Sequence, residues 1–276
     1  MGSVMASDPL VSCLMVTLAS PARMPLIQRS IADYAAQTWP RRELVVVCDP
    51  TAGEARELNA YVAGLGRDDI RLFPTKGPLA LGALRNLSRA NAQGDIHCQW
   101  DDDDRFHPTR IERQLAALGD ADALLLEQVM MLTPALGALH CLSWRGVDLG
   151  AMPATLMCRR DAPARYKEEA DAPGHPVEDT DFLRQLLAAG RVTMLPDAPH
   201  LYVYVAHGAN SWHEGHIAML RERLALSRGL LQRREPVMRE SLAAFDFGGP
   251  VRVMGANGEA FALAPQDRGS TATRSA

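Results

Sequence analysis

Short apolar runs and longer helical segments alternate through the first part of the chain. The apolar runs predict buried strands at residues 11–18, 43–48, 70–73 and 96–100. The segments between them, two of which are closed by a glycine, predict helices at residues 25–39, 54–65 and 81–92. Strands that alternate with helices of about 12 residues indicate βαβ units and a parallel sheet. The pattern therefore predicts an α/β fold.

The second part of the chain is less regular. We predict helices at residues 108–118, 177–190 and 217–231, and strands at residues 123–126, 150–159, 192–195 and 201–205. A polar segment with proline and glycine at residues 161–176 predicts a loop. The helix at 217–231 is amphipathic, and we expect it to pack on the domain with its basic side in solvent. Asn257-Gly258, within residues 248–263, is typical of a hairpin turn.

Composition and charge narrow the class of protein. Apolar residues make up 47% of the chain and charged residues 22%, which is ordinary for a globular protein with a sizeable core. The net charge of −4 gives no reason to expect nucleic-acid binding. The five cysteines form no CxxC pair, which suits a reducing cytoplasm. We see no secretory signal, and the uncharged segment 128–144 is too short and interrupted to span a bilayer, so any membrane contact is expected to be peripheral, at the inner face.

Four consecutive aspartates, Asp101 to Asp104, follow the predicted strand 96–100. Alternate side chains of a strand share one face, so Asp101 and Asp103 are expected to converge and to need a counter-charge. Magnesium and manganese favour such oxygen ligands. A solvated acidic turn and a calcium loop are the alternatives, although no EF-hand spacing follows. Asp49 ends another predicted strand, and ligands bind at the carboxyl ends of parallel strands, which favours a binding site.

Six segments, in this order, resemble those of family-two glycosyltransferases of the GT-A fold. They are VSCLMVT, ELVVVCD, LGALRN, WDDDD, VEDTDF and HGANSW. The resemblance covers about residues 9 to 215. It implies a GT-A-type, Rossmann-like, mostly parallel sheet flanked by helices, with a C-terminal helical extension.

The resemblance also implies a division of the chain. Residues 9–104 would be the nucleotide-binding half and residues 105–215 the acceptor half of the domain. Residues 216–264 would add a C-terminal helix and a hairpin. A flexible start, residues 1–8, and a disordered tail, residues 265–276, would complete the chain.

For the donor site, the resemblance implies that Thr17, Asp49, Gly82, Arg85, Asp101 and Asp102 bind the nucleotide sugar. Asp49 would accept a hydrogen bond from the base, although Cys48 stands where the family usually has a second acidic residue. Gly82 would let the backbone approach the nucleotide. Arg85 would offer its planar fork to the diphosphate or to carboxylates of the pocket.

For the reacting centre, the resemblance implies that Asp103 and His207 hold Mn²⁺ or Mg²⁺, while Asp101 or Asp102 contacts the ribose or a metal-bound water. Asp179 would be the general base, in preference to Asp181. The chain is then expected to be an inverting, metal-dependent glycosyltransferase with a nucleotide-sugar donor, a UDP-sugar by expectation, and an unidentified hydroxyl acceptor. A non-catalytic nucleotide-sugar or carbohydrate-binding protein and a sugar-1-phosphate nucleotidyltransferase are the alternatives.

Overall fold

The computed structural model describes residues 8–49, 55–169 and 178–265. Within these residues, seven strands form the larger sheet in the order β10-β6-β9-β4-β1-β2-β3. Their bounds are β1 Val11–Thr17, β2 Arg42–Cys48, β3 Ile70–Pro74, β4 Ile96–Gln99, β6 Ala123–Leu126, β9 Met157–Arg159 and β10 Val192–Leu195. All neighbouring strands run parallel except at β9, which is antiparallel to both β4 and β6. The predicted α/β fold with a mostly parallel sheet is confirmed.

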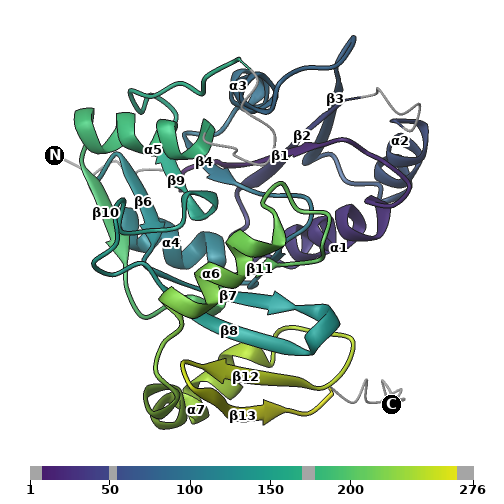
Figure 1. Ribbon diagram of the computed structural model, residues 1–276. Helices are drawn as coiled ribbons and strands as arrows, with labels where there is room; N and C mark the ends of the chain where they lie inside the picture. Colours follow the sequence, from purple (N-terminus) through teal and green to yellow (C-terminus); the bar gives the residue numbers. More distant parts are fainter. Residues whose placement is uncertain (1–7, 50–54, 170–177, 266–276) are drawn as a thin grey trace, which may run out of the picture.

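Helices cover both faces of this sheet. They are α1 Met24–Ala35, α2 Ala55–Gly64, α3 Leu81–Asn91, α4 Arg110–Leu118 and α5 Glu178–Ala189. Figure 1 shows α3 and α5 above the larger sheet and α1 and α4 below it. Helix α1 has Pro25 in its first turn, a position that suits proline, and buries Ile27, Ile31 and Tyr34 on one stripe. Because the sheet is covered on both faces, β2 is apolar and buried almost throughout.

A second sheet, which the sequence pattern did not predict, lies beside the first (Figure 1). Its order is β13-β12-β8-β7-β11-β5. Its strands are β5 Arg105–Phe106, β7 Gln128–Thr133, β8 Ala138–Ser143, β11 Tyr202–Val205, β12 Val251–Gly255 and β13 Gly258–Leu263. The uncharged segment 128–144 thus forms a hairpin, β7 and β8, buried between neighbouring strands and helix α7 (Arg228–Leu242).

Two predictions for the second part of the chain were wrong. Residues 150–159 contain a 3₁₀ turn, η2 (Pro153–Thr155), before a strand of only three residues, since Pro153 fixes its φ and has no N–H for a ladder. The single helix at 217–231 is two helices, α6 (Glu214–Leu224) and α7. The chain turns between them because Leu226 N donates to Cys141 O of β8 (2.9 Å) and the Ser227 hydroxyl caps α7.

The C-terminal hairpin is confirmed. The turn is one residue earlier than predicted: Ala256 and Asn257 (φ 70°) connect Gly255 of β12 to Gly258 (φ 122°), its partner in β13. Strand β12 adds in parallel to β8. The predictions for the flexible start and most of the tail lie outside the described residues, as does part of the predicted loop 161–176.

Gly82, in the first turn of α3, lies directly against the segment that follows β9. A Cβ atom at this position would be 1.8 Å from the backbone oxygen of Lys167. Gly82 therefore allows close packing of two backbone segments, and its approach to a nucleotide stays a prediction.

We expect Gly82→Ala to destabilise the protein by about 1–3 kcal/mol or more, because backbone on both sides must move. Gly64→Ala is the matched control, since nothing lies within 4 Å of its Cβ position, and it should change stability by less than about 1 kcal/mol. Denaturant unfolding of both variants measures the difference. Equal stabilities would show that the contact with Lys167 relaxes without cost.

Candidate active site

Three predicted site residues lie at one edge of the larger sheet because β1, β2 and β4 are parallel and adjacent. Thr17 ends β1 and pairs with Cys48, the last residue of β2, so Asp49 follows beside it. The Asp49 N–H donates to Thr17 O (3.0 Å), and Trp100 N donates to Leu14 O (3.1 Å) just before the acidic run begins. The carboxyl ends of the strands thus place Thr17, Asp49 and Asp101 together.

The acidic run is not a solvated turn. Asp102 is 3% and Asp104 1% exposed. Its backbone is fixed by helix α1, since the Ser30 hydroxyl donates to Asp101 O (2.9 Å) and the Arg29 guanidinium to Asp103 O (2.8 Å). Carboxylates held this deep need partners, because burial of an unpaired charge is costly.

Arg23, just before α1, is the main partner of Asp102 and Asp103. Its Nε donates to Asp102 Oδ2 (3.0 Å), and its terminal nitrogen contacts both Asp102 and Asp103, the latter at 2.9 Å. Burial raises the pKa of Asp102, with Arg23 opposing. Burial also acts to raise the pKa of Asp103, but His207 and Arg23 outweigh it and the pKa is lowered. Asp103 is therefore the more firmly ionised of the two.

Asp104 has a structural role of its own. It accepts hydrogen bonds from the Tyr202 hydroxyl and from Val205 N (2.8 Å), which ties the acidic run to β11. Burial, followed by the charges of Asp103 and Asp101, raises its pKa well above the ordinary aspartate value. Asp104 therefore links β11 to the acidic run.

The link through Asp104 also places His207, two residues after Val205. The His207 ring Nε2 lies 3.0 Å from Asp103 Oδ2. Its backbone N–H donates to Asn210 Oδ1 (2.9 Å), which holds the turn after β11. The two predicted metal ligands are thus in direct contact, although they are far apart in the sequence.

Arg85, on α3, joins the acidic run to helix α5. Its Nη1 lies 3.3 Å from Asp101 Oδ1 and its Nε 3.2 Å from Glu178 Oε1. Burial opposes the charge of Arg85, but Asp101 and the other acidic neighbours raise its pKa.

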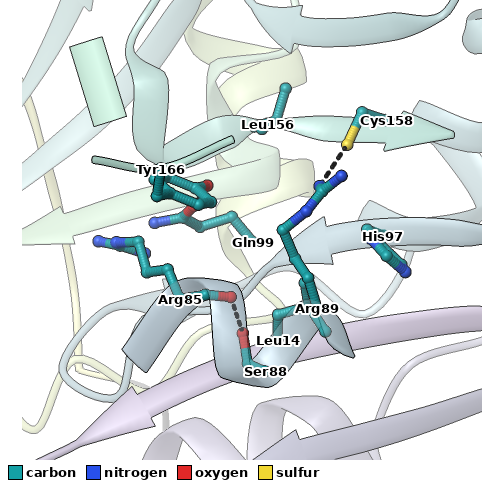
Figure 2. A pocket seen from close by; sticks show the side chains of 9 residues that line it. All are labelled: Leu14, Arg85, Ser88, Arg89, His97, Gln99, Leu156, Cys158 and Tyr166. Atoms are coloured by element: carbon teal, nitrogen blue, oxygen red, sulfur yellow. Dashed lines mark hydrogen bonds between the residues drawn. The ribbon is translucent and has the colours of Figure 1, made fainter. Parts of the chain in front are cut away.

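Side chains from β4, from α3 and from the segment after β9 hold Arg85 and Asp101 in place. Figure 2 shows Arg85, Gln99 and Tyr166 converging, with the Ser88 hydroxyl donating to Arg85 O (2.7 Å). The Tyr166 hydroxyl lies 3.1 Å from Gln99 Oε1, and Gln99 Nε2 donates to Asp101 Oδ1 (3.1 Å). Asn86 fixes the backbone of Tyr166 through both its N–H and its carbonyl. Arg85 is therefore held by Asp101, Glu178 and the Tyr166 ring, and it is not a surface arginine.

Asp179, in the first turn of α5, lines a cavity of about 150 Å³ that the acidic run also lines. The lining includes Asp101 to Asp104, Arg23, Arg85, Glu178, Asp179, Tyr204 and Trp212. Burial and the charge of Asp101 raise the pKa of Asp179, while Arg85 and Thr180 oppose the shift. Asp181, by contrast, pairs with Arg184 on the exposed side of the helix.

Part of the sequence resembles a known family. Residues 14–129, which run from β1 into β7, match the model of the family described as Glycosyl transferase family 2. This part of the chain is similar to glycosyltransferase family 2. No curated protein matches the sequence.

Solved structures of glycosyltransferases share the GT-A fold of this chain. One is S. aureus TarS 1-349 in complex with UDP-GlcNAc, with a TM-score of 0.57, 16% identity, and coverage of 85% of this chain and 66% of that one. Another is the mannosyltransferase PcManGT from Pyrobaculum calidifontis in complex with GDP-Man and Mn²⁺, with a TM-score of 0.54, 15% identity, and coverage of 86% and 64%. This chain spans slightly less than two thirds of each of these structures.

The cavity unites some of the predicted residues and not others. Asp101, Asp102, Asp103, Arg85 and Asp179 line it, and His207 reaches it through Asp103. Thr17 is not in the lining, and its hydroxyl accepts a hydrogen bond from Ala19 N (3.0 Å). Asp49 is buried at the end of β2, with Leu79 N at 3.4 Å from its carboxylate. The contact of Asp49 with a base stays a prediction.

Arg23 was not predicted as a site residue. Its signal in the sequence was indirect: four adjacent carboxylates require a cation, and Arg23 stands in the loop after β1 that must cross the same edge of the sheet. Glu178 was noted only as part of a motif, yet its buried carboxylate holds Arg85.

The described residues contain neither a preformed metal site nor a membrane-spanning helix. Across residues 8–49, 55–169 and 178–265, no group of three or more His, Cys, Asp or Glu side chains is arranged to hold a metal ion by itself. Among the same residues, no helix has the length and apolar character that crossing a membrane requires.

Proposed function

We propose that this protein is an inverting, metal-dependent glycosyltransferase that moves a sugar from a nucleoside diphosphate sugar to an acceptor hydroxyl. The observation that carries the proposal is the shared cavity of Asp101 to Asp103 and Asp179. Asp101 to Asp103 are suited, through a bound cation, to the diphosphate end of the donor. Asp179 is a carboxylate with a raised pKa, which is suited to accept a proton.

The donor is proposed to be a UDP-sugar, with Thr17, Asp49, Arg85, Asp101 and Asp102 around it. TarS is described with UDP-GlcNAc and PcManGT with GDP-Man, which supports a nucleotide sugar without selecting the base. Arg85 can offer fixed N–H donors to the donor because Glu178 and Tyr166 hold its guanidinium in place.

The residues present fit a divalent cation, with the donor completing its ligands. Asp103 Oδ2 and His207 Nε2 converge at 3.0 Å, and a carboxylate with a neutral imidazole suits Mn²⁺ better than Mg²⁺. Two protein ligands are few, so oxygens of the diphosphate and water would supply the others. When bound, the ion would neutralise charge on the departing nucleoside diphosphate.

Asp179 would act on the acceptor. Its carboxylate accepts the proton of the attacking hydroxyl, which approaches the sugar from the face opposite the leaving group. Arg85 opposes the effect of burial on the pKa of Asp179 and so favours its ionised form.

The cellular location belongs to the same proposal. All five cysteines are free and buried in the structure, which suits a reducing cytoplasm. We propose a cytoplasmic protein with, at most, peripheral contact with the inner membrane face.

We expect Asp179→Asn to lower transfer by roughly 10²–10⁴-fold while donor affinity changes little, because a positioned base contributes about that factor. Asp181→Asn is the matched control on the same helix and should keep near wild-type activity. Product formation from labelled nucleotide sugars with Mn²⁺ measures transfer, and calorimetry measures donor binding. Transfer that survives in Asp179→Asn would remove Asp179 as the base, and donor binding by the wild type without turnover would favour the non-catalytic binding protein.

The pH dependence follows from the raised pKa of Asp179. A base must be ionised, so activity should fall as pH decreases through this pKa, at a pH above the ordinary aspartate value of about 3.9. Asp101→Asn removes a negative charge that raises the pKa of Asp179, and the acidic limb should therefore move to lower pH. Profiles of kcat at saturating donor for both proteins measure the shift. An unchanged limb would mean that another group controls it.

Arg23 competes with the cation for Asp103. Because Arg23→Gln removes a positive charge 2.9 Å from Asp103 Oδ2, we expect it to tighten Mn²⁺ binding without nucleotide by about tenfold, or roughly 1.4 kcal/mol. Electron paramagnetic resonance of free Mn²⁺ measures the affinity. Arg67→Gln, which breaks the distant Arg67–Asp69 pair, is the control. Equal affinity in all three proteins would show that Arg23 does not compete.

A further inference from the structure

A second cavity, of about 230 Å³, adjoins the donor cavity at Asp179. Five residues line both cavities: Met152, Ala154, Asp179, Tyr204 and Trp212. The candidate base therefore stands between two connected spaces. If the donor occupies the space beside Asp101 to Asp103, the second cavity is the one from which a hydroxyl can reach Asp179.

The walls of the second cavity are mainly apolar and aromatic. Trp144, after β8, forms one part and is packed into the main core. Ile217 and Leu220 of α6 and the Trp212 ring form another. Trp212 stacks on His216 with ring centroids 3.9 Å apart, which fixes the indole. A rigid aromatic and aliphatic wall binds apolar surface at a low entropic cost.

Leu149 supplies an independent observation. Its side chain lines the second cavity, and its φ of 70° lies in the left-handed region that residues with a Cβ rarely adopt. Asn or Gly would satisfy this backbone without strain. Strained residues of this kind concentrate at binding sites, where the surrounding structure holds them.

The charges at the second cavity discriminate between acceptors. Of the described residues that line it, none is a lysine or an arginine, while Asp148 and Asp179 are acidic. Asp148 is exposed and lies 3.9 Å from Arg184, whereas Asp179 is buried beside the donor cavity, so an anionic acceptor would meet the Asp179 carboxylate with no lysine or arginine in the lining to offset it. An uncharged acceptor meets no such repulsion.

We propose that the second cavity is the acceptor site, and that it takes an uncharged glycoside whose sugar hydroxyl reacts at Asp179 and whose apolar aglycone packs on Leu149, Leu220 and Trp212. The proposal rests on the proposed function and names its acceptor class. It separates this chain from transferases that extend anionic polymers.

The test compares hexyl β-glucoside with methyl β-glucoside in the presence of UDP and Mn²⁺, with tryptophan fluorescence as the binding signal. We expect hexyl glucoside to bind at least tenfold more tightly than methyl glucoside, and glucose 6-phosphate to bind more weakly than both. Leu220→Asp should remove most of the advantage of the hexyl chain. Equal affinity for the two glucosides, or no binding of either, overturns the proposal.

A control variant separates the second cavity from another apolar cavity. That third cavity lies between α7 and the second sheet, and its lining includes Leu231, Val237 and Met238. Val237 is 66% exposed. Val237→Asp should leave hexyl glucoside binding unchanged. Loss of binding in Val237→Asp with retention in Leu220→Asp would place the ligand in the third cavity and overturn the proposal.

Leu149→Gly covers the case in which Leu220→Asp does not fold. Glycine relieves the left-handed strain, which offsets part of the packing that Leu149 loses against the core, so the variant should remain folded, while hexyl glucoside binds at least threefold more weakly. Unchanged hexyl binding in a folded Leu149→Gly contradicts the proposed site. These binding results are independent of turnover, whereas failure of the proposed function would appear as absent transfer with any acceptor and donor.

Discussion

The buried carboxylates at the end of β4 are the constraint on which the rest of the site depends. Four adjacent aspartates cannot all be ionised in a protein interior without compensating charge, and the fold meets this requirement in several ways. Arg23 neutralises Asp102 and Asp103, and Arg85 pairs with Asp101. Asp104 is instead held by Tyr202 and a backbone N–H, with a raised pKa. The same need for positive charge makes the site receptive to a cation.

The four aspartates divide their tasks according to their neighbours. Asp101 points toward α3 and α5 through Arg85, and Asp103 points toward β11 through His207. Asp104 has no direct part in the proposed chemistry, but by anchoring β11 it determines where His207 lies. A structural carboxyl therefore brings together Asp103 and His207, the proposed metal ligands. Loss of activity in an Asp104 variant would therefore not show that Asp104 contacts a substrate.

The second sheet gives the two connected cavities their common wall. Strand β11 supplies Tyr204 to both, and the turn after it supplies Trp212. Helix α5 contributes Asp179 from the opposite side, held near Arg85 by the neighbouring Glu178. The proposed donor and acceptor spaces thus meet where an acidic, polar region gives way to an apolar one. Under the proposal, this gradient suits a charged leaving group on one side and an uncharged acceptor on the other.

Much of this could be predicted from the sequence, because local patterns determine local structure. The alternation of apolar runs and helices predicted the larger sheet, and strand ends marked by Asp49 and Asp101 predicted the edge at which the site lies. The second sheet could not be predicted, since its strands come from distant segments and β5 has only two residues. The break between α6 and α7 depends on the hydrogen bond from Leu226 N to Cys141 O of β8. The need for glycine at position 82 depends on the nearby backbone of Lys167. Likewise, only tertiary packing brings Arg23 to Asp102, because charge pairing in a folded chain is decided by distance in space, and no spacing in the sequence records it.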